Sequence, residues 1–435
     1  MSIEQITGTV LRPGDGAYAE AASVYAGTGT PTLIVRPRSA QDVAHAIGYA
    51  RAESLVVSIR SGGHSGLAHS TNDGGLVIDL RDLSVIAVDG TRVSIGGGAT
   101  WGAIAAALRD HGLALSSGDT LSVGVGGLTL GGGFGWLVRQ YGLAIDSLVG
   151  AEVVTAAGEI LDASETDSPE LFWAIRGGGG NFGVVTRFDF EAHPLEGVVF
   201  GTITYPADDL EPVLRRWRNV MREAPEALNS TFLALPSFGP DVPPSAQVLV
   251  CFSGTDEAAA LAVYEPLLVG STSHDILARP YTEVLDEAHP PEGVLFENNN
   301  ALARVLDDDT IAGLVRGYSA IGSGVLMIRS LGGAFGRVGS DATAFAHRDA
   351  EALVITAGFI PPEEEGQGRA RFRRAWDGEF APHLHGAYGN FLGTDDVATV
   401  ERICLPATLQ RLRSVKAQYD PENVFARNQN VPPGE

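Results

Sequence analysis

The chain has 435 residues, of which 44% are hydrophobic and 55 are glycine. A chain of this length and apolar content can bury a large core, so we expect two domains, or one domain with a large insert. The formal net charge is -23, from 53 acidic and 30 basic residues. Such a balance opposes binding to nucleic acid and to anionic lipid, so we expect neither as a partner.

No run of about 18 apolar residues occurs, and the N-terminal stretch MSIEQITGTVLRPGDG lacks the basic and apolar regions of a secretory signal. We therefore expect a cytoplasmic protein without a membrane span. The two cysteines, Cys251 and Cys404, lie in apolar contexts without CxxC or Cys/His spacing. This pattern predicts buried, inert thiols and neither a disulfide framework nor a metal site.

The first part of the chain alternates predicted strands and helices. Residues 31–60 read as strand, helix, strand, with Ser39 and Asp42 spaced as a capping box at the helix start. Residues 86–97 predict a hairpin that turns at Asp-Gly, and residues 101–112 predict a helix that a glycine ends.

The pattern changes at about residue 197. Strands such as VVFGTITYP and SAQVLVCFSG now alternate with helices such as LEPVLRRWRNVMREA. This predicts an antiparallel sheet with helices on one face. The last predicted helix, LPATLQRLRSVKAQY, ends at Asp420-Pro421.

Four glycine-rich turns, at residues 61–66, 124–127, 131–135 and 177–183, stand out in the first part. Exposed N–H groups in such turns can line one long anionic ligand, and we favour a phosphate-bearing ligand over glycines that only make tight turns. The GxGxxG match in the last turn follows a helix and precedes a strand, the reverse of the order in a Rossmann site. A P-loop needs a lysine after its glycines, and the only lysine of the chain is Lys416.

Five segments carry a family resemblance: RSGGHS at 60–65, VGVGG at 123–127, GGGFG at 131–135, RGGGGNFGVV at 176–185, and YDPENVF at 419–425 with residues 428–433 after it. In this combination and order they resemble the berberine-bridge-enzyme-like branch of the vanillyl-alcohol-oxidase flavoprotein superfamily. The resemblance implies an α+β protein: a PCMH-type FAD-binding domain of two α/β subdomains, plus a substrate domain with an antiparallel sheet flanked by helices. We assign residues 1–196 to the FAD-binding domain, 197–395 to the substrate domain, and 396–435 to a C-terminal return to the FAD-binding domain.

The resemblance also implies that His64 forms a covalent bond to the 8α-methyl group of the flavin, while the turn around it holds the pyrophosphate. An alkylated imidazole withdraws electron density, which should make the flavin a stronger oxidant. The alternative is a turn histidine that caps a backbone carbonyl. Further FAD contacts are expected from Arg60, Ser61, Gly62, Gly63, Ser65, Gly66, Gly118, Thr120, Val123, Gly124, Gly126, Gly127, Gly131, Gly132, Gly133, Phe134, Gly135, Gly183, Val184, Val185, Tyr388, Asn428 and Asn430.

Two positions bear on the flavin chemistry. Many relatives carry a second flavin link through a cysteine where this chain has Thr120, so we predict a single covalent bond. The threonine either hydrogen-bonds near the ring or is a loop hydroxyl. Val123 stands where valine is associated with oxidases and leucine with dehydrogenases, which favours oxygen as acceptor; the alternative is a valine that faces the core of the loop.

Three residues are catalytic candidates. His69 can take a proton from a substrate hydroxyl or amine, since its ordinary pKa lies near working pH, or it hydrogen-bonds the loop. Tyr388 resembles the family's flavin-facing tyrosine, with Asn390 as support for the local backbone. A phenol with a pKa near 10 is a poor base, so this role needs a nearby cation, for which Arg329 and Arg348 are candidates.

The sequence thus predicts an FAD-linked oxidase that moves a hydride from an alcohol, sugar or amine carbon of a small molecule to flavin N5. A polar side chain takes the proton, and oxygen reoxidises the flavin with release of hydrogen peroxide. Two alternatives stay open: a flavin dehydrogenase with a non-oxygen acceptor, and a flavin-binding protein without turnover.

Overall fold

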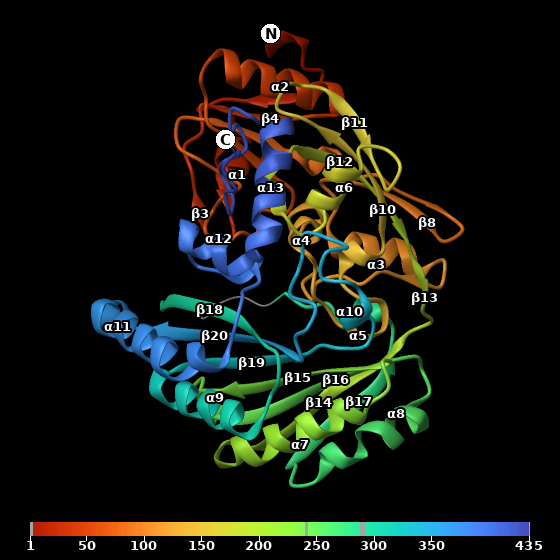
Figure 1. The fold of residues 1–435 in the computed structure, drawn as a ribbon, viewed down its shortest axis with the longest axis vertical. Coiled ribbons are helices and arrows are strands. Elements are labelled where there is room, and N and C mark those ends of the chain that lie inside the picture. Colours follow the sequence, from red (N-terminus) through yellow and green to blue (C-terminus); the bar gives the residue numbers. More distant parts are fainter. Residues whose placement is uncertain (1–2, 240–241, 288–292, 435) are drawn as a thin grey trace.

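A computed structural model describes residues 3–239, 242–287 and 293–434. Its elements form two stacked halves, and the C-terminal helix α13 (Pro406–Tyr419) packs in the same half as the N-terminal elements (Figure 1). The predicted domain boundaries fall just before β14 and just before α12; the division itself stays a prediction. Within the described ranges, no helix combines the length and the hydropathy that a bilayer span requires.

The first sheet leads directly into the first glycine turn. Its strand order is β1-β4-β6-β5, with β6 parallel to both β4 and β5. Ser39 Oγ accepts a hydrogen bond from the Asp42 N–H at 3.2 Å, which is one half of the predicted capping box. The Asp42 carboxylate instead accepts from the Arg38 amide at 2.9 Å, so the reciprocal half was a wrong expectation. The elements are β1 (Thr9–Leu11), β4 (Leu33–Arg36), α2 (Ala40–Ala52), β5 (Val57–Arg60) and β6 (Leu76–Asp79).

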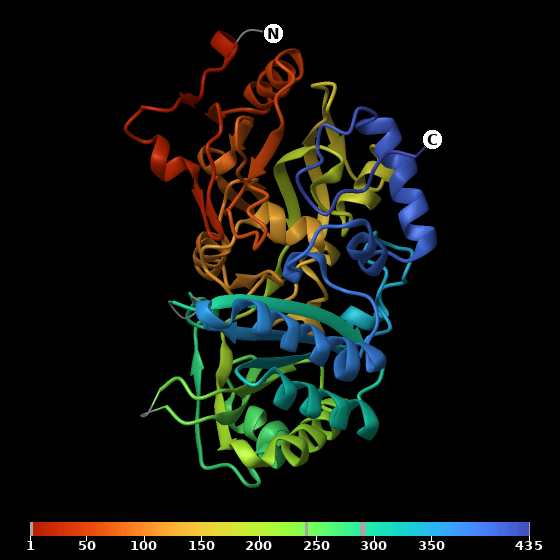
Figure 2. The ribbon, with the colours of Figure 1, turned by 90° about the vertical axis from the view of Figure 1, so that its left-hand side faces the viewer.

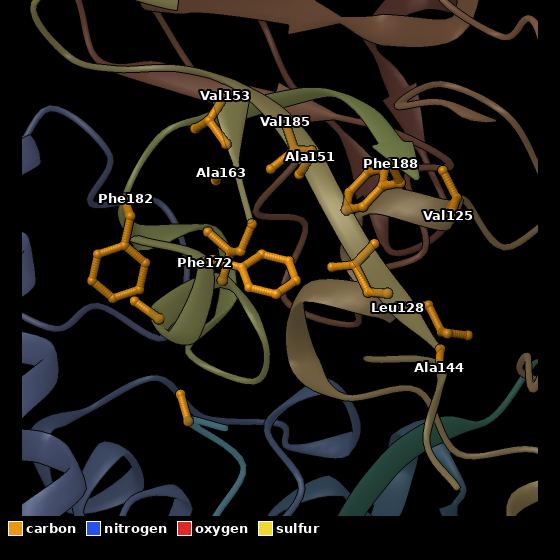
Figure 3. Close-up of a cluster of buried hydrophobic side chains, with 14 of the residues drawn as sticks. Val125, Leu128, Ala144, Ala151, Val153, Ala163, Phe172, Phe182, Val185 and Phe188 are labelled. Carbon is orange, nitrogen blue, oxygen red and sulfur yellow. The ribbon is translucent and has the colours of Figure 1, made fainter. Parts of the chain in front are cut away.

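The second sheet is antiparallel, in the order β11-β10-β12-β8-β7. It contains the predicted hairpin of β7 and β8, which turns at Gly90 with a φ of 60°. One face packs on helices α3 and α6 in a core that includes Phe172 and Phe188 (Figure 3). The elements are β7 (Ile86–Asp89), β8 (Arg92–Gly96), α3 (Trp101–Arg109), β10 (Leu148–Val154), β11 (Ile160–Ala163), α6 (Pro169–Ile175) and β12 (Val184–Glu191).

The other half confirms the predicted antiparallel sheet with helices on one face. Seven strands pair in the order β17-β14-β16-β15-β19-β20-β18, and the helices lie on the face that points away from the first half (Figures 1 and 2). The elements are β14 (Val198–Pro206), α7 (Leu210–Glu223), β15 (Leu228–Leu235), β16 (Ser245–Ser253), α8 (Glu257–Tyr264), β17 (Ser273–Arg279), β18 (Leu295–Ala303), α9 (Asp308–Ile321), β19 (Gly324–Ser330), β20 (Ala352–Ile360) and α11 (Glu365–Ala375).

Shorter elements connect these layers. They are α1 (Tyr18–Ala22), α5 (Val138–Tyr141), α10 (Ala334–Arg337) and α12 (Val397–Ile403), with the two-stranded pairs β2 (Ser23–Val24) and β3 (Gly27–Thr28), and β9 (Leu113–Ala114) and β13 (His193–Pro194).

One expectation was wrong in its local structure. Residues 124–127 read as a turn, but Gly124 is the N-cap of a helix, α4 (Val125–Gly131). Each glycine inside a helix costs about 1 kcal/mol relative to alanine. Val125 and Leu128 are buried in the core (Figure 3), and burying such side chains contributes about 1.5–3 kcal/mol each. Tertiary burial therefore outweighs the low helix propensity.

The only lysine of the chain holds the C-terminal tail in place. The Lys416 ammonium is fully buried and donates to Asp420 Oδ2 at 2.6 Å, to the Phe425 carbonyl at 3.0 Å and to the Asn181 carbonyl at 2.8 Å. Asp420 also accepts hydrogen bonds from the amides of Val424 and Phe425. This arrangement ties α13 and the tail to the glycine turn at 177–183.

We predict that Lys416→Met lowers the free energy of unfolding by about 3–5 kcal/mol, because the Asp420 carboxylate is then buried without its cation. Urea denaturation measures this. The control is Arg411→Met on the same helix, whose ion pair with Glu170 is largely exposed and should contribute at most about 1 kcal/mol. Equal losses in the two variants would contradict a special role of the buried pair.

Candidate active site

Two glycine turns meet at backbone contact in the first half. A Cβ atom added to Gly62 would lie 2.2 Å from the Gly124 nitrogen, and one added to Gly124 would lie 2.1 Å from the Gly62 nitrogen. No side chain fits at either position. Ser61 Oγ joins the same elements, because it donates to the Gly97 carbonyl at 2.7 Å and accepts from the Gly126 N–H at 3.2 Å.

The first turn presents amide groups that fit a phosphate. Among the described residues, no acceptor receives a hydrogen bond from the amides of Gly62, Gly63 or Ser65. Gly63 has a φ of 78°, and a turn that reverses hand in this way gathers successive N–H groups into an anion-binding nest. A Cβ at Gly66 or Gly127 would meet nothing within 4 Å. The turn therefore offers both donors and open space to an anionic group such as a pyrophosphate.

His64 is held between the two turns. Its Nε2 lies 2.8 Å from Ser122 Oγ, and the Ser122 hydroxyl and amide lie 2.8 and 2.6 Å from the two carboxylate oxygens of Glu287. The Tyr25 ring stacks on the imidazole at a centroid distance of 5.3 Å. Sequence reasoning missed Ser122 and Glu287. Ser122 adjoins the VGVGG segment, but nothing in the sequence links it to a carboxylate 165 residues later.

Tyr388 and Asn390 lie against the glycine-rich segment. The Asn390 amide donates to the Gly127 carbonyl at 3.0 Å and to Tyr388 Oη at 2.9 Å. The Gly133 N–H also donates to Tyr388 Oη, at 3.3 Å. The tyrosine ring meets the Phe134 ring edge to face at 4.7 Å. The second half of the molecule thereby supports the backbone of α4 and of the turn after it.

The environment of Tyr388 disfavours a role as base. Burial raises the pKa of the phenol to about 12, although the hydrogen bonds from Gly133 and Asn390 and the charge of Arg329 act in the opposite direction. Tyr388 is therefore protonated at neutral pH. Of the two cations that the sequence suggested, Arg329 acts on it from an ion pair with Asp119. Arg348 instead forms a buried pair with Asp146, with nitrogen–oxygen distances of 2.7 and 2.8 Å.

His69 has a carboxylate partner on the segment that follows Asn390. Its Nε2 lies 3.1 Å from Asp395 Oδ2, and its side chain is 16% exposed. Burial lowers the pKa of the imidazole, and the hydrogen bond and charge of Asp395 offset part of that shift. The imidazole is therefore neutral at pH 7 and can accept a proton. Its catalytic role stays a prediction.

The other residues predicted to contact FAD differ in the polar atoms that they can present to a ligand. The buried Oδ1 atoms of Asn428 and Asn430 meet no hydrogen-bond donor in the described part of the chain, so they can accept from a ligand. By contrast, Val184 and Val185 bury their side chains in β12, within hydrophobic clusters. A strand buried on both faces leaves main-chain atoms to a ligand, so the predicted contact of these two residues with FAD stays a prediction.

Three residues next to the turns have protein partners. The Arg60 guanidinium donates to the Ala21 carbonyl at 2.7 Å. Thr120 pairs as an isolated bridge with Asp286, and the backbone of Val123 accepts the Trp101 N–H at 2.9 Å while its partly buried side chain packs against the first-half core. These contacts fix the backbone next to the glycine-rich segments. The predicted contacts of all three residues to the flavin stay predictions.

Comparison with known proteins places this geometry in a family. Residues 31–164 match the family described as "FAD binding domain", and residues 407–432 match "Berberine and berberine like". These two matches contain the first glycine turns and the C-terminal tail.

Similar proteins cover nearly the whole chain. The (R)-6-hydroxynicotine oxidase of Paenarthrobacter nicotinovorans is 32% identical over 98% of this chain and 97% of its own length. The xylooligosaccharide oxidase of Myceliophthora thermophila C1, solved with xylobiose, superposes with a TM-score of 0.88 at 25% identity, over 100% of this chain and 98% of that one. A glucooligosaccharide oxidase from Acremonium strictum, described with a 6-S-cysteinyl, 8α-N1-histidyl FAD, superposes with a TM-score of 0.86 at 25% identity over the full length of both chains.

These comparisons confirm the family resemblance, the PCMH-type α+β fold and the assignment as an enzyme. The chain belongs to the berberine-bridge-enzyme-like family of FAD-linked oxidoreductases, within the vanillyl-alcohol-oxidase superfamily.

Proposed function

We propose that the protein is an oxidase whose FAD is tethered by one covalent bond through His64. In this proposal it takes a hydride from a carbon that bears oxygen or nitrogen in a small molecule, and dioxygen is the final acceptor. The observation that carries the proposal is the position of the imidazole, which lies between the two contacting turns and beside amides that fit a pyrophosphate. The names of the relatives, a hydroxynicotine oxidase and oligosaccharide oxidases, support an amine or a sugar as substrate.

The cysteines support a single link. Both are buried, Cys251 in β16 and Cys404 just after α12. Burial raises the pKa of both thiols, that of Cys404 to about 12. Because the thiolate is the reactive form, these side chains are poor partners for a flavin. Thr120, the position at which relatives carry the second link, has a hydroxyl in place of a thiol.

In this proposal the residues around the turns have separate roles in the reaction. FAD supplies the hydride acceptor and the electron chemistry when bound. Tyr388 keeps its proton and holds it at Oη, where it can donate to a substrate heteroatom while Gly133 and Asn390 fix the phenol. His69 is neutral and takes the proton that leaves the substrate. Val123, where relatives of the oxidase type carry valine, supports oxygen as acceptor.

We predict that acid precipitation leaves the flavin colour with the wild-type protein and releases it from His64→Ala. The reason is that only a covalent bond survives unfolding. Absorbance of pellet and supernatant measures this, and Thr120→Ala serves as a control that should keep the colour in the pellet. Colour that stays with His64→Ala would place the link elsewhere, and colour released from the wild type would remove the tether from the proposal.

We predict that the rate of flavin reduction by substrate falls as the pH drops through the lowered pKa of His69, below about 6.5. The neutral imidazole is the active form, so its protonation stops proton acceptance. His69→Asn should lose this limb and react about 10²–10⁴-fold more slowly. Anaerobic stopped-flow measurements, with a substrate found in a panel of sugars, alcohols and amines, test this.

Asp395→Asn is the matched variant for this pH profile. The Asp395 carboxylate raises the pKa of His69, so its removal should move the acidic limb to lower pH while the rate at pH 7 to 8 changes little. An unchanged limb in both His69→Asn and Asp395→Asn would assign the titration to another group and end the role of His69.

A further inference from the structure

The three side chains His64, Ser122 and Glu287, which we call the relay, have one consistent set of donors and acceptors. A carboxylate only accepts, and a serine hydroxyl has a single proton. Ser122 Oγ therefore donates to Glu287 Oε2 at 2.8 Å, and the proton of the 2.8 Å contact to His64 lies on Nε2. In the neutral imidazole the lone pair is then on Nδ1. Proteins often set the tautomer of a histidine in this way.

We propose that Ser122 and Glu287 are positioning residues for the covalent attachment of the flavin to His64. They hold the imidazole with its proton on Nε2, so that Nδ1 is the nucleophile, and they take up the positive charge that forms on the ring. This proposal rests on the proposed function, because it needs the His64 tether.

The backbone around the relay holds it in register. Segment 119–122 runs beside segment 286–287: the Leu121 amide donates to the Asp286 carbonyl at 3.1 Å, and the Asp286 amide donates to the Asp119 carbonyl at 2.8 Å. The Ser122 amide adds a second hydrogen bond to Glu287, at 2.6 Å. Both carboxylate oxygens are thus engaged by one residue, which fixes the direction of the serine hydroxyl.

The carboxylate comes from the other half of the molecule. Glu287 follows β17 of the seven-stranded sheet, whereas His64 and Ser122 belong to the glycine turns. The attachment site is therefore complete only when the two halves are folded against each other.

The atoms of the attachment balance with dioxygen as oxidant. A C–H bond of the 8α-methyl group is replaced by a bond from carbon to Nδ1, which removes two electrons and two protons from the pair of reactants. One proton leaves the methyl group and the other leaves Nε2, since alkylation at Nδ1 makes the ring cationic. The relay accepts the second proton through the Ser122 hydroxyl. Dioxygen takes the two electrons and two protons and becomes hydrogen peroxide.

The experiment follows covalent flavin formation in full-length protein that is purified from riboflavin-starved cells and mixed with FAD in air. Samples are quenched in acid over time, and the flavin bound to the pellet is measured. Glu287→Gln removes the charge of the relay, and Glu283→Gln is the control, because this exposed carboxylate in the same segment undergoes the same change of charge. We expect attachment to slow on the order of 10²-fold in Glu287→Gln and to keep the wild-type rate in Glu283→Gln.

A second pair isolates the hydroxyl. Ser122→Thr keeps it, and Ser122→Val has the same shape as the threonine variant without it. Attachment should stay near the wild-type rate in the threonine variant and slow on the order of 10²-fold in the valine variant. Fluorescence titration of non-covalent FAD binding, completed before attachment, should give equal affinities for the pair.

The outcomes separate this proposal from the tether itself. Wild-type protein that releases its flavin in acid would end the proposed function and the relay together. A tethered wild type with normal attachment rates in both Glu287→Gln and Ser122→Val would overturn only the relay. If attachment slows only in parallel with a loss of FAD affinity, Ser122 and Glu287 merely hold the two loops together. That result would also overturn the positioning role.

Discussion

The contact between Gly62 and Gly124 is the constraint on which the site depends. Two backbones approach there more closely than any side chain allows, and the approach sets the distance between the strand that ends at Arg60 and the helix that begins at Val125. It brings His64 to Ser122, and the amides of Gly62, Gly63 and Ser65 beside this contact meet no acceptor in the described part of the chain. A methyl group at either glycine would push the two backbones apart. The contact between His64 and Ser122 and the arrangement of the first-turn amides would then be lost together.

The second feature is that the residues of the candidate site come from both halves. Asn390 and Tyr388 reach the glycine-rich segment from beyond the seven-stranded sheet, and Glu287 reaches Ser122 from the end of the same sheet region. In the proposed function the first half would hold the cofactor, and the second half would contribute the residues that face the substrate. Such a division agrees with relatives that share the fold and act on molecules as different as hydroxynicotine and oligosaccharides.

The single lysine of the chain lies outside the candidate site. The chain has a formal charge of -23 and a single lysine, and that lysine is buried with Asp420 as a structural link. The amides of the first turn can hold a diphosphate through backbone dipoles, which present partial positive charge without a mobile lysine. This fits a cofactor that stays bound, since rigid donors lose little freedom when the ligand arrives.

The sequence by itself indicated the family and singled out His64 through the resemblance of five motifs, and it determined the main strands and helices, because side-chain periodicity and turn chemistry are local properties. It could not determine that residues 125–131 form a helix, since burial of Val125 and Leu128 overrides the low propensity of the glycines. Nor could it show that Tyr388 keeps its proton or that Glu287 is linked to His64 through Ser122. A pKa depends on burial, and a hydrogen bond between residues 165 positions apart depends on how two halves pack. Only the tertiary structure decides these, because both are set by distances through space that the order of residues along the chain does not contain.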